Sequence, residues 1–584
     1  MADSQTALAA DPQAALAEQV SAALVAAFGS EYAEADPVIR PSAFADFQSN
    51  VALALGKRLG QPPREVASRV AGHLSGSPMF ELVEVSGPGF INITLSAAWI
   101  TQMASAQLAD PRLGVAAVSA PQRVVVDYSA PNVAKEMHVG HLRTTVVGDA
   151  FVRVLKFLGH EVIRANHIGD WGTNFGILLE HLIDVGEQAA YEQLAAGEIN
   201  PFYQAAKAKF DAEPAFADRS RRRVVALQAG EPETLRLWQM LVNDSKLYYN
   251  AIYGKLGVTL TDADLAPESM YNSMLEAVCR DLEQAGVATI SDGALCAFPP
   301  GFIGRDGSPL PLILRKSDGG YGYGTTDMAA IRYRVADLKA DRIDYVVGSE
   351  QAQHFAMVFA VARQAGWLPD SVRAEHAAIG MVTGADKKRF RTRTGQSVKL
   401  IDLIDEAVSR AEEVIKDRYD EPELRAQIAE AVGIGALKYA DLSVARDSSY
   451  VLDFDRMLTL TGNTGPYLQY ATARIRSIFH RAELDPEEVT GPITPAEPAE
   501  RTLALRLLGL EAAVSQAAQT AEPHKLAAFL FDVASEFTTF YEQCPVLKAQ
   551  DQAVRQSRLA LASLTLRVLL RGLDLLGIPV PERM

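Results

Sequence analysis

Residues 124–176 read VVVDYSAPNVAKEMHVGHLRTTVVGDAFVRVLKFLGHEVIRANHIGDWGTNFG, and this stretch decides the fold. Residues 123–128 contain a β-branched run that is typical of a buried parallel strand. Residues 129–132, Ser-Ala-Pro-Asn, break this strand, and a helix is predicted from about residue 140 to residue 158. A second strand is predicted over residues 160–164. The stretch therefore predicts one β-α-β unit, the beginning of a doubly wound fold.

Two histidines, His138 and His141, stand three residues apart where the first strand gives way to the helix. At this spacing we expect both imidazoles on one helical face. The helix N-terminus adds unpaired N–H groups and a partial positive charge that suit a phosphate. Gly140 leaves room for a base or a ribose to approach the backbone. These features predict a nucleotide site at the carboxyl end of the first strand.

Taken alone, the H-x-x-H spacing is a weak signal, because two histidines three residues apart are more often incidental. A zinc protease would need H-E-x-x-H, and no glutamate stands in that arrangement here. The three cysteines, Cys279, Cys296 and Cys544, form no C-x-x-C pair. Neither a metal site nor a disulfide framework is therefore predicted, and a reducing cytoplasmic setting is expected.

The chain has 584 residues, too many for one core, and its length predicts roughly three to five domains. We expect an N-terminal α/β module, a Rossmann-like nucleotide-binding core, a basic loop with connecting helices, and a C-terminal helical bundle. The predicted boundaries are 1–115, 121–385, 386–455 and 456–584, with a linker over 110–122 and a polar, mostly helical insertion in the core at about 186–300.

Several elements are predicted outside the first β-α-β unit. In the N-terminal module we expect helices over 13–28 and 49–59 and two strands within 80–95. After the insertion the core is expected to resume with strands over 310–314 and 344–347 and a helix over 354–365. In the C-terminal bundle we expect a loop over 485–499. A further helix is predicted to start near Thr520 as N-cap, with Pro523 in its first turn.

The composition is that of a globular protein, with 48% hydrophobic and 22% charged residues. The chain starts without the basic and apolar segments of a signal peptide, and no apolar run is long enough for a transmembrane helix, so no membrane partner is expected. The net charge of −16 argues at first against nucleic acid. A local basic patch on an acidic body can nevertheless bind phosphates.

Residues 124–176 closely resemble the arginyl-tRNA synthetases, and the resemblance extends from residues 46–50, DFQSN, to residues 581–584, PERM. Within it, His138-Val139-Gly140-His141 resembles the HIGH signature of class I aminoacyl-tRNA synthetases. The resemblance implies that His138 and His141 contact the phosphates of ATP and stabilise the transition state of adenylate formation.

The resemblance also implies a site for arginine, whose planar, multi-donor guanidinium pairs naturally with carboxylates. Tyr323 and Asp327 are expected to hold the guanidinium. Asp127, Asn132 and Gln351 are expected at the α-amino end or in nearby polar contacts. A site built for these donors rejects analogues that lack them, so no separate editing domain is expected.

The second class I signature, a Lys-Met-Ser-Lys-Ser-type loop, is degenerate here. The corresponding residues 384–395 read GADKKRFRTRTG, which is basic and bounded by glycines. Lys387, Lys388 and Arg391 are expected to contact ATP as part of a mobile cationic loop. The second lysine of the usual signature has no clear counterpart. The resemblance implies that Lys135, just before the first signature, supplies the missing charge.

The C-terminal region resembles the anticodon-binding bundle of this family. Tyr467 and Tyr470 are expected to stack on unpaired bases, and Arg474 and Met584 are also expected to contact tRNA. Tyrosines three residues apart on a helix are more often core residues, so only some of these contacts are expected. The N-terminal module resembles the domain that reads the outer corner of tRNA.

We therefore expect an arginine–tRNA ligase that acts as a monomer, with ATP as substrate and Mg²⁺ as the nucleotide counter-ion. The resemblance further implies a ribose 2′-hydroxyl acceptor and a need for tRNA in the first step. One rival is a class I enzyme such as a cysteine ligase; the lack of a cysteine cluster and the presence of Tyr323 and Asp327 argue against it. The other is a non-catalytic tRNA-binding relative, which predicts a damaged His138 or His141, and both are intact.

Overall fold

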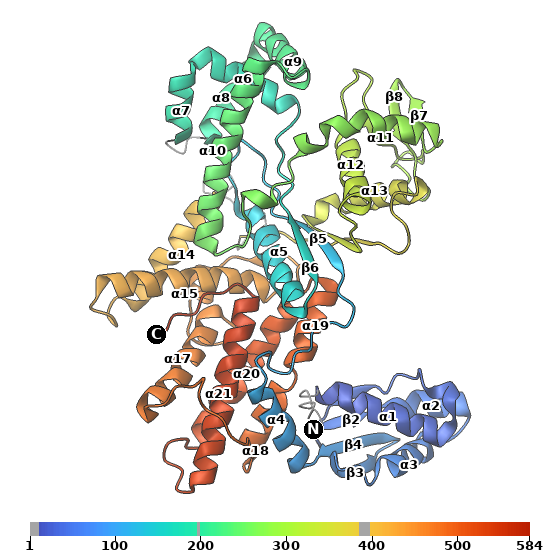
Figure 1. The fold of residues 1–584 in the computed structure, drawn as a ribbon, viewed down its shortest axis with the longest axis vertical. Helices are drawn as coiled ribbons and strands as arrows, with labels where there is room; N and C mark the ends of the chain where they lie inside the picture. Colours follow the sequence, from blue (N-terminus) through green and yellow to red (C-terminus); the bar gives the residue numbers. More distant parts are fainter. Residues whose placement is uncertain (1–10, 196–198, 385–397) are drawn as a thin grey trace, which may run out of the picture.

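The computed structural model describes residues 11–195, 199–384 and 398–584 of the chain. Figure 1 shows a small N-terminal α/β module, a central region of strands flanked by helices, and a C-terminal bundle of helices. This arrangement confirms the predicted architecture of an α/β core with an α/β module and an all-α bundle. Within the described ranges, no helix combines the length and apolar character that crossing a membrane requires.

The N-terminal module is built on one antiparallel sheet with the strand order β1-β2-β4-β3. The predicted second helix begins at Val51, directly after its N-cap Asn50, and a further helix that was not predicted starts at Pro63. Proline suits this first helical position because its missing N–H is not needed there. The elements are α1 (Pro12–Phe28), β1 (Ile39–Pro41), β2 (Phe47–Ser49), α2 (Val51–Leu59), α3 (Pro63–Leu74), β3 (Phe80–Ser86) and β4 (Phe90–Leu95), followed by α4 (Ala97–Ala109).

The central sheet is parallel, with the strand order β11-β10-β5-β6. The predicted β-α-β unit is present as β5 (Arg123–Tyr128), α5 (Val139–Leu158) and β6 (Glu161–Ala165). From β10 (Arg342–Val346) the chain passes through α13 (Ala352–Gln364) to β11 (Arg373–His376), which lies on the side of β10 away from β5. The chain therefore diverges from the adjacent pair β5 and β10, and a doubly wound sheet binds ligands at the carboxyl ends of such a pair.

The strand predicted over 310–314 exists but does not belong to the central sheet. It is β9 (Leu312–Arg315), which pairs antiparallel with β8 (Ala294–Ala297), itself paired with β7 (Ala288–Ser291). Buried and exposed residues alternate along the start of β9, whereas every residue of β10 is buried. A half-buried antiparallel strand and a fully buried parallel strand differ in this pattern, but a short apolar run in sequence does not distinguish them.

Apart from a short parallel pair of strands, β12 (Val382–Thr383) and β13 (Tyr450–Val451), the remaining elements of the described chain are helices. Between β6 and β10 they are α6 (Thr173–Val185), α7 (Glu187–Ala195), α8 (Ile199–Ala212), α9 (Pro214–Gln228), α10 (Pro232–Leu256), α11 (Asn272–Gln284) and α12 (Tyr323–Ala336). After the central sheet they are α14 (Leu400–Ile415), α15 (Pro422–Leu442), α16 (Phe454–Met457), α17 (Gly465–Ala482), α18 (Pro498–Leu507), α19 (Leu510–Thr520), α20 (Pro523–Gln543) and α21 (Gln552–Leu575).

The prediction that Thr520 caps a helix is wrong. Thr520 is the last residue of α19, and α20 starts at Pro523 after Glu522. The Thr520 hydroxyl bonds the Glu522 carboxylate instead of a backbone N–H of α20. Ala521 follows α19 in a left-handed conformation with φ 52°, so a tight turn separates α19 from α20. Thr520 therefore belongs to the end of one helix and not to the start of the next.

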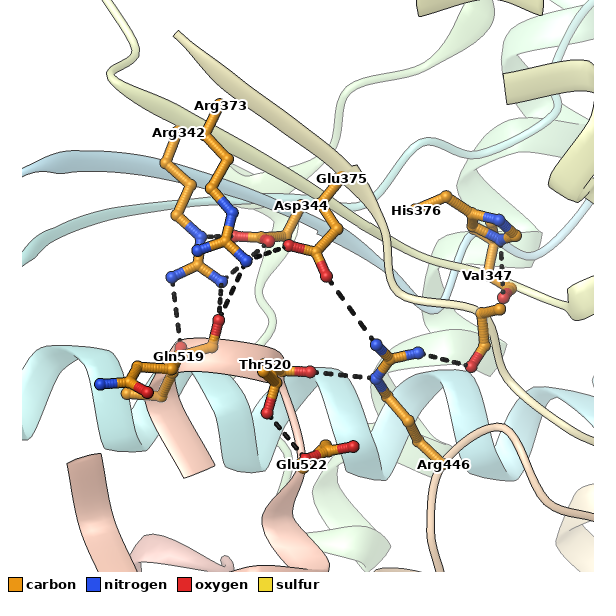
Figure 2. A network of polar contacts seen from close by, with 12 residues as sticks. Arg342, Asp344, Val347, Arg373, Glu375, His376, Arg446, Gln519, Thr520 and Glu522 are labelled. Atoms are coloured by element: carbon orange, nitrogen blue, oxygen red, sulfur yellow. Dashed lines mark hydrogen bonds and ion pairs between the residues drawn. The ribbon is translucent and has the colours of Figure 1, made fainter. Parts of the chain in front are cut away.

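The end of α19 joins the helical bundle to the central sheet through three arginines (Figure 2). Arg342, the first residue of β10, donates to the carbonyls of Ala518 and Gln519 at 3.2 and 3.3 Å. Arg373 of β11 donates to the Gln519 carbonyl at 3.1 Å, and Arg446 donates to the Thr520 carbonyl at 3.1 Å. The last carbonyls of a helix lack partners within the helix and carry partial negative charge, so these cations stabilise the junction.

Arg342 also forms an ion pair with Asp344, with its Nε 2.8 Å from Oδ2, and both side chains are buried. Burial raises the pKa of Asp344 to about 6. We predict that Arg342→Met lowers the free energy of unfolding by about 3–5 kcal/mol at pH 7.5, because it leaves a buried charge without its partner. Protonation of Asp344 removes that charge, so the loss should shrink when chemical denaturation is repeated near pH 5.

Arg373→Met is the matched control. The Arg373 side chain is half exposed, and its ion pair with Glu375 lies at the surface. Arg373→Met should lower the free energy of unfolding by no more than about 1 kcal/mol. Equal losses for the two variants, or a loss for Arg342→Met that does not depend on pH, would contradict this account.

Candidate active site

The loop after β5 is held in an unusual backbone conformation. Ser129, Ala130 and Ala134 have φ values of 72°, 50° and 57°. A non-glycine residue in this left-handed region costs about 1–3 kcal/mol and persists only where its surroundings hold it, most often at functional sites. The loop therefore marks the carboxyl end of β5 as the centre of the site.

Asn132 lies in this loop beside Gly169, with which it forms a parallel β-bridge. A Cβ at Gly169 would lie 2.2 Å from Asn132 Oδ1, so only glycine leaves that side chain where it is. The Asn132 side chain is exposed at the carboxyl end of β5. The segment HIGDWG thus serves to place Asn132, a function that its sequence alone does not reveal.

The two signature histidines cap α5 reciprocally. His138 is the N-cap with extended backbone, and its Nδ1 accepts a 3.0 Å hydrogen bond from the Gly140 N–H. His141 Nδ1 accepts a 3.0 Å hydrogen bond from the His138 N–H. The expectation that both imidazoles lie on one helical face is therefore wrong, because His138 lies outside the helix. The rings do meet, with centroids 4.1 Å apart.

The reciprocal cap fixes which nitrogen of each ring accepts a hydrogen bond, and this is Nδ1 in both. Burial, with the neighbouring His138, lowers the pKa of His141 to about 3, so His141 is neutral at neutral pH. A neutral imidazole that accepts at Nδ1 carries its proton on Nε2. Both histidines can then donate from Nε2 at the N-terminus of α5, where unpaired N–H groups and the helix dipole also favour an anion.

A buried ion pair fixes α5 itself. Arg143, two residues after His141, is 1% exposed, and its Nε lies 2.6 Å from Asp441 Oδ1 on α15. Its Nη1 donates to the Ser448 carbonyl at 2.6 Å. The start of the signature helix is thereby anchored to the helices that lead into the C-terminal bundle.

Lys135 and Glu136, just before the signature, contact two other parts of the chain. The Lys135 ammonium lies 4.7 Å from the centre of the Tyr203 ring on α8, a cation–π contact. Glu136 is buried and pairs with Lys399 at 2.7 Å. The Val139 N–H donates to the Val398 carbonyl at 3.1 Å, so the chain that follows the basic loop runs beside the signature. Lys387, Lys388 and Arg391 lie outside the described residues.

Tyr323 and Asp327 occupy the first turns of α12. Gly322 precedes the helix, and its N–H donates to the Leu314 carbonyl of β9 at 2.8 Å, which sets the start of α12. The Tyr323 side chain is exposed, whereas Asp327 is largely buried and its Oδ2 lies 2.6 Å from His354 Nε2 on α13. The Asp327 carboxylate raises the pKa of His354 against the effect of burial. Two of the residues predicted to bind arginine thus lie about one turn apart on the same helix.

Asp127 lies near the end of β5, and Gln351 follows the end of β10. Asp127 is 3% exposed, and its Oδ2 pairs with Arg334 of α12 at 2.5 Å. It therefore lies beneath the site with its charge already compensated. Gln351 is exposed in the short turn after β10, at the start of α13. β5 and β10 are neighbours, so Asn132 and Gln351 both follow the carboxyl ends of adjacent strands.

Sequence reasoning missed Glu268. This residue is largely buried, and burial, with the charges of Asp170 and Asp327, raises its pKa to about 8. Its own charge contributes to raising the pKa of Tyr323. The backbone N–H of Glu268 donates to the Ile168 carbonyl at 3.1 Å, so the chain after α10 folds back onto the HIGDWG segment. No local signal marks Glu268, because long-range contacts such as this one fix its position and Asp327 acts on it from a distant part of the chain.

The site therefore has two chemically distinct ends. At the start of α5, neutral imidazole donors and helix N–H groups suit a phosphate. Around α12, the carboxyl groups of Asp327 and Glu268 with the Tyr323 hydroxyl suit a cation with several donors. In the described residues no group of three or more His, Cys, Asp or Glu could hold a metal ion.

The residues predicted to contact tRNA lie on or beside α17. Tyr467, Tyr470 and Arg474 line one cavity of about 380 Å³. The Tyr467 ring packs on Phe531 with centroids 5.7 Å apart, and the Arg474 guanidinium lies 5.0 Å from the centre of the Tyr470 ring. Met584, at the end of the chain, instead lines a second cavity of about 540 Å³ together with residues of α17. The four residues thus divide between two cavities beside α17.

Comparison with family models covers most of the chain. Residues 103–454 match the model for the tRNA synthetases class I (R) catalytic domain. Residues 14–95 match the arginyl tRNA synthetase N terminal domain, and residues 468–584 match the DALR anticodon binding domain.

Relatives match over nearly the full length. The chain is 61% identical to the arginine–tRNA ligase of Thermobifida fusca over 577 residues, which cover 98% of this chain and all of the relative. It is 48% identical to that of Edwardsiella ictaluri, over 98% of this chain and all of the relative. Its fold is similar to the crystal structure of arginyl-tRNA synthetase from Plasmodium falciparum, with a TM-score of 0.82, 28% identity and coverage of 98% and 99% of the two chains. Because the catalytic model spans more than half of the chain and these relatives match from end to end, the chain belongs to the class I arginyl-tRNA synthetase family.

Proposed function

We propose that the protein ligates arginine to tRNA in two steps. The arginine carboxylate attacks the α-phosphorus of ATP, which forms arginyl-adenylate and releases pyrophosphate. A ribose 2′-hydroxyl of the terminal adenosine of tRNA then attacks the activated carbonyl and releases AMP. Two observations carry this proposal: the start of α5, after β5, is suited to a phosphate, and a carboxyl cluster around α12 is suited to a guanidinium.

We assign the ATP end to His138, Gly140 and His141. The Nε2 donors of the two imidazoles favour the charge that develops on the phosphates, and preorganised donors of this kind supply much of enzymatic rate enhancement. Lys135, three residues before His138, adds a cation. The loop residues Lys387, Lys388 and Arg391 belong to the same proposal by the family pattern. Catalysis then rests mainly on positioning and charge stabilisation.

We assign the arginine end to Tyr323, Asp327 and Glu268, which bind the guanidinium. Asn132 and Gln351, which follow adjacent strands, bind the α-amino end. Asp127 supports the site from beneath through its pair with Arg334. A guanidinium carries five N–H donors, so it takes up several acceptors at once, and an analogue without those donors leaves carboxylates unpaired.

Mg²⁺ enters this reaction as the counter-ion of ATP, and we assign it no protein ligand. We propose a cytoplasmic monomer, a setting that suits three cysteines that are buried and free. For tRNA we propose contacts with Tyr467, Tyr470, Arg474 and Met584 on the bundle, and contacts of the N-terminal module with the outer corner. We also propose that tRNA is required for the first step.

Aminoacylation of bulk tRNA with each standard amino acid in turn tests this function. Only arginine should be attached, and pyrophosphate exchange should proceed with tRNA and arginine together but not with arginine alone. Attachment of a different amino acid would overturn the specificity. Full exchange without tRNA would overturn the tRNA requirement but leave the ligase activity standing.

Asp327→Ala should raise the KM for arginine on the order of 100-fold and leave the KM for ATP little changed, because it removes a charged acceptor from the guanidinium. The control is Asp337→Ala, an exposed aspartate that follows the other end of the same helix. Exchange kinetics measure both constants. An unchanged requirement for arginine would remove Asp327 from the pocket.

The pH dependence tests Glu268. Its raised pKa of about 8 means that the carboxyl group is protonated in most of the molecules at pH 7 and ionises as the pH rises. A guanidinium binds the ionised form, so the KM for arginine should fall between pH 6.5 and pH 8.5. Glu268→Gln should raise the KM and abolish this trend. Retention of the same trend in the variant would show that another group is responsible.

A further inference from the structure

One face of α10 carries three buried hydroxyl groups at a spacing of four residues. Ser245, Tyr249 and Tyr253 are 2%, 1% and 3% exposed. At this spacing their side chains lie in one row along the helix. Burial raises the pKa of both tyrosines, so their hydroxyls are protonated and able to donate.

Each hydroxyl contacts the loop that follows β5. The Ser245 hydroxyl accepts from the Ala134 N–H at 2.9 Å and donates to the Leu241 carbonyl of its own helix at 2.9 Å. The Tyr249 hydroxyl donates to the Asn132 carbonyl at 2.7 Å. The Tyr253 and Ser129 hydroxyls share a 2.7 Å hydrogen bond.

These contacts fall on or beside the strained residues. Ser129 and Ala134 are two of the three loop residues with positive φ, and Asn132 lies between them. The third, Ala130, is held by Asn166, whose Oδ1 accepts from the Ala130 N–H at 3.1 Å and whose Nδ2 donates to the Tyr253 hydroxyl at 3.0 Å. The row therefore supports the whole loop, because a left-handed conformation persists only where the surroundings specify it.

We propose that Ser245, Tyr249 and Tyr253 are positioning residues for adenylate formation, with Tyr249 acting most directly through Asn132. α10, far along the chain from the loop, begins beside α9 and ends near α14 (Figure 1). It sets where Asn132 and Lys135 stand relative to the signature histidines. This inference rests on the proposed function, in which Asn132 binds arginine.

Tyr249→Phe removes the hydroxyl and keeps the ring. We expect kcat/KM for arginine in tRNA-dependent pyrophosphate exchange to fall on the order of 10-fold, because a small misplacement of a binding group reduces the rate steeply. Tyr439→Phe is the matched control. The Tyr439 hydroxyl on α15 is also buried and donates to the Ala527 carbonyl at 3.1 Å, away from the loop. It should lower the melting temperature by a similar amount and leave the exchange kinetics unchanged.

A double-mutant cycle with Asn132→Ala separates positioning from general damage. If Tyr249 acts through Asn132, the double variant loses less than the product of the two single losses. Full multiplication of the two losses, or kinetics for Tyr249→Phe that match Tyr439→Phe, would overturn the proposal. If Asn132→Ala leaves the arginine KM unchanged while Tyr249→Phe impairs exchange, the assignment of Asn132 fails. The claim that Tyr249 acts through Asn132 fails with it, whereas the ligase activity itself stands if arginine is still attached to tRNA.

Discussion

The parallel pairing of β5 with β10 is the constraint on which the site depends. Val124 to Tyr128 lie in register with Arg342 to Val346, so the two strands end together, and the chain leaves them in opposite directions. Everything that the site uses follows from this divergence. The loop with Asn132 and the signature helix leave β5, whereas Gln351 and α13, which carries the Asp327 partner His354, follow β10. A parallel pair requires long crossovers, and here the crossover between these two strands includes the helices that close the site.

The two ends of the proposed site have opposite charge requirements, one for phosphates and one for a guanidinium. The chain carries a net charge of −16, yet the proposed ATP end of the site must attract phosphates. The groups assigned to this task at the start of α5 are mostly neutral, namely the imidazoles and backbone N–H groups. The opposite end concentrates carboxyl groups, and burial together with their mutual repulsion raises the pKa of Glu268 to about 8, which keeps it largely protonated at pH 7. Partial charges at one end and full charges at the other fit an anionic nucleotide and a cationic amino acid.

How much the sequence could predict differs from feature to feature, for identifiable reasons. The β-α-β unit was predictable because β-branched residues, a break and a helical period follow one another within residues 123–165. The nearness of His138 and His141 was predictable from their spacing. The reciprocal cap was not, because the N-cap conformation of His138 depends on the loop before it. β9 was assigned to the wrong sheet because a short apolar run carries no information about the strand with which it pairs. Glu268 and the hydroxyl row of α10 could not be predicted, because their contacts with the site are to residues about a hundred positions away in the chain.

The reciprocal cap of His138 and His141 also explains why the signature uses imidazole. Each ring presents an acceptor to the backbone on one edge and a donor on the opposite edge, with a rigid aromatic frame between them. A glutamine or asparagine carries its acceptor and donor side by side on one flexible end, and a lysine has no acceptor at all. In the proposed ATP site, any replacement therefore loses either the bond that caps the helix or the donor assigned to the phosphate. A substitution at His138 or His141 removes a cap of α5 as well as a side-chain donor. Loss of activity in such a variant therefore does not by itself measure the contribution of the donor to catalysis.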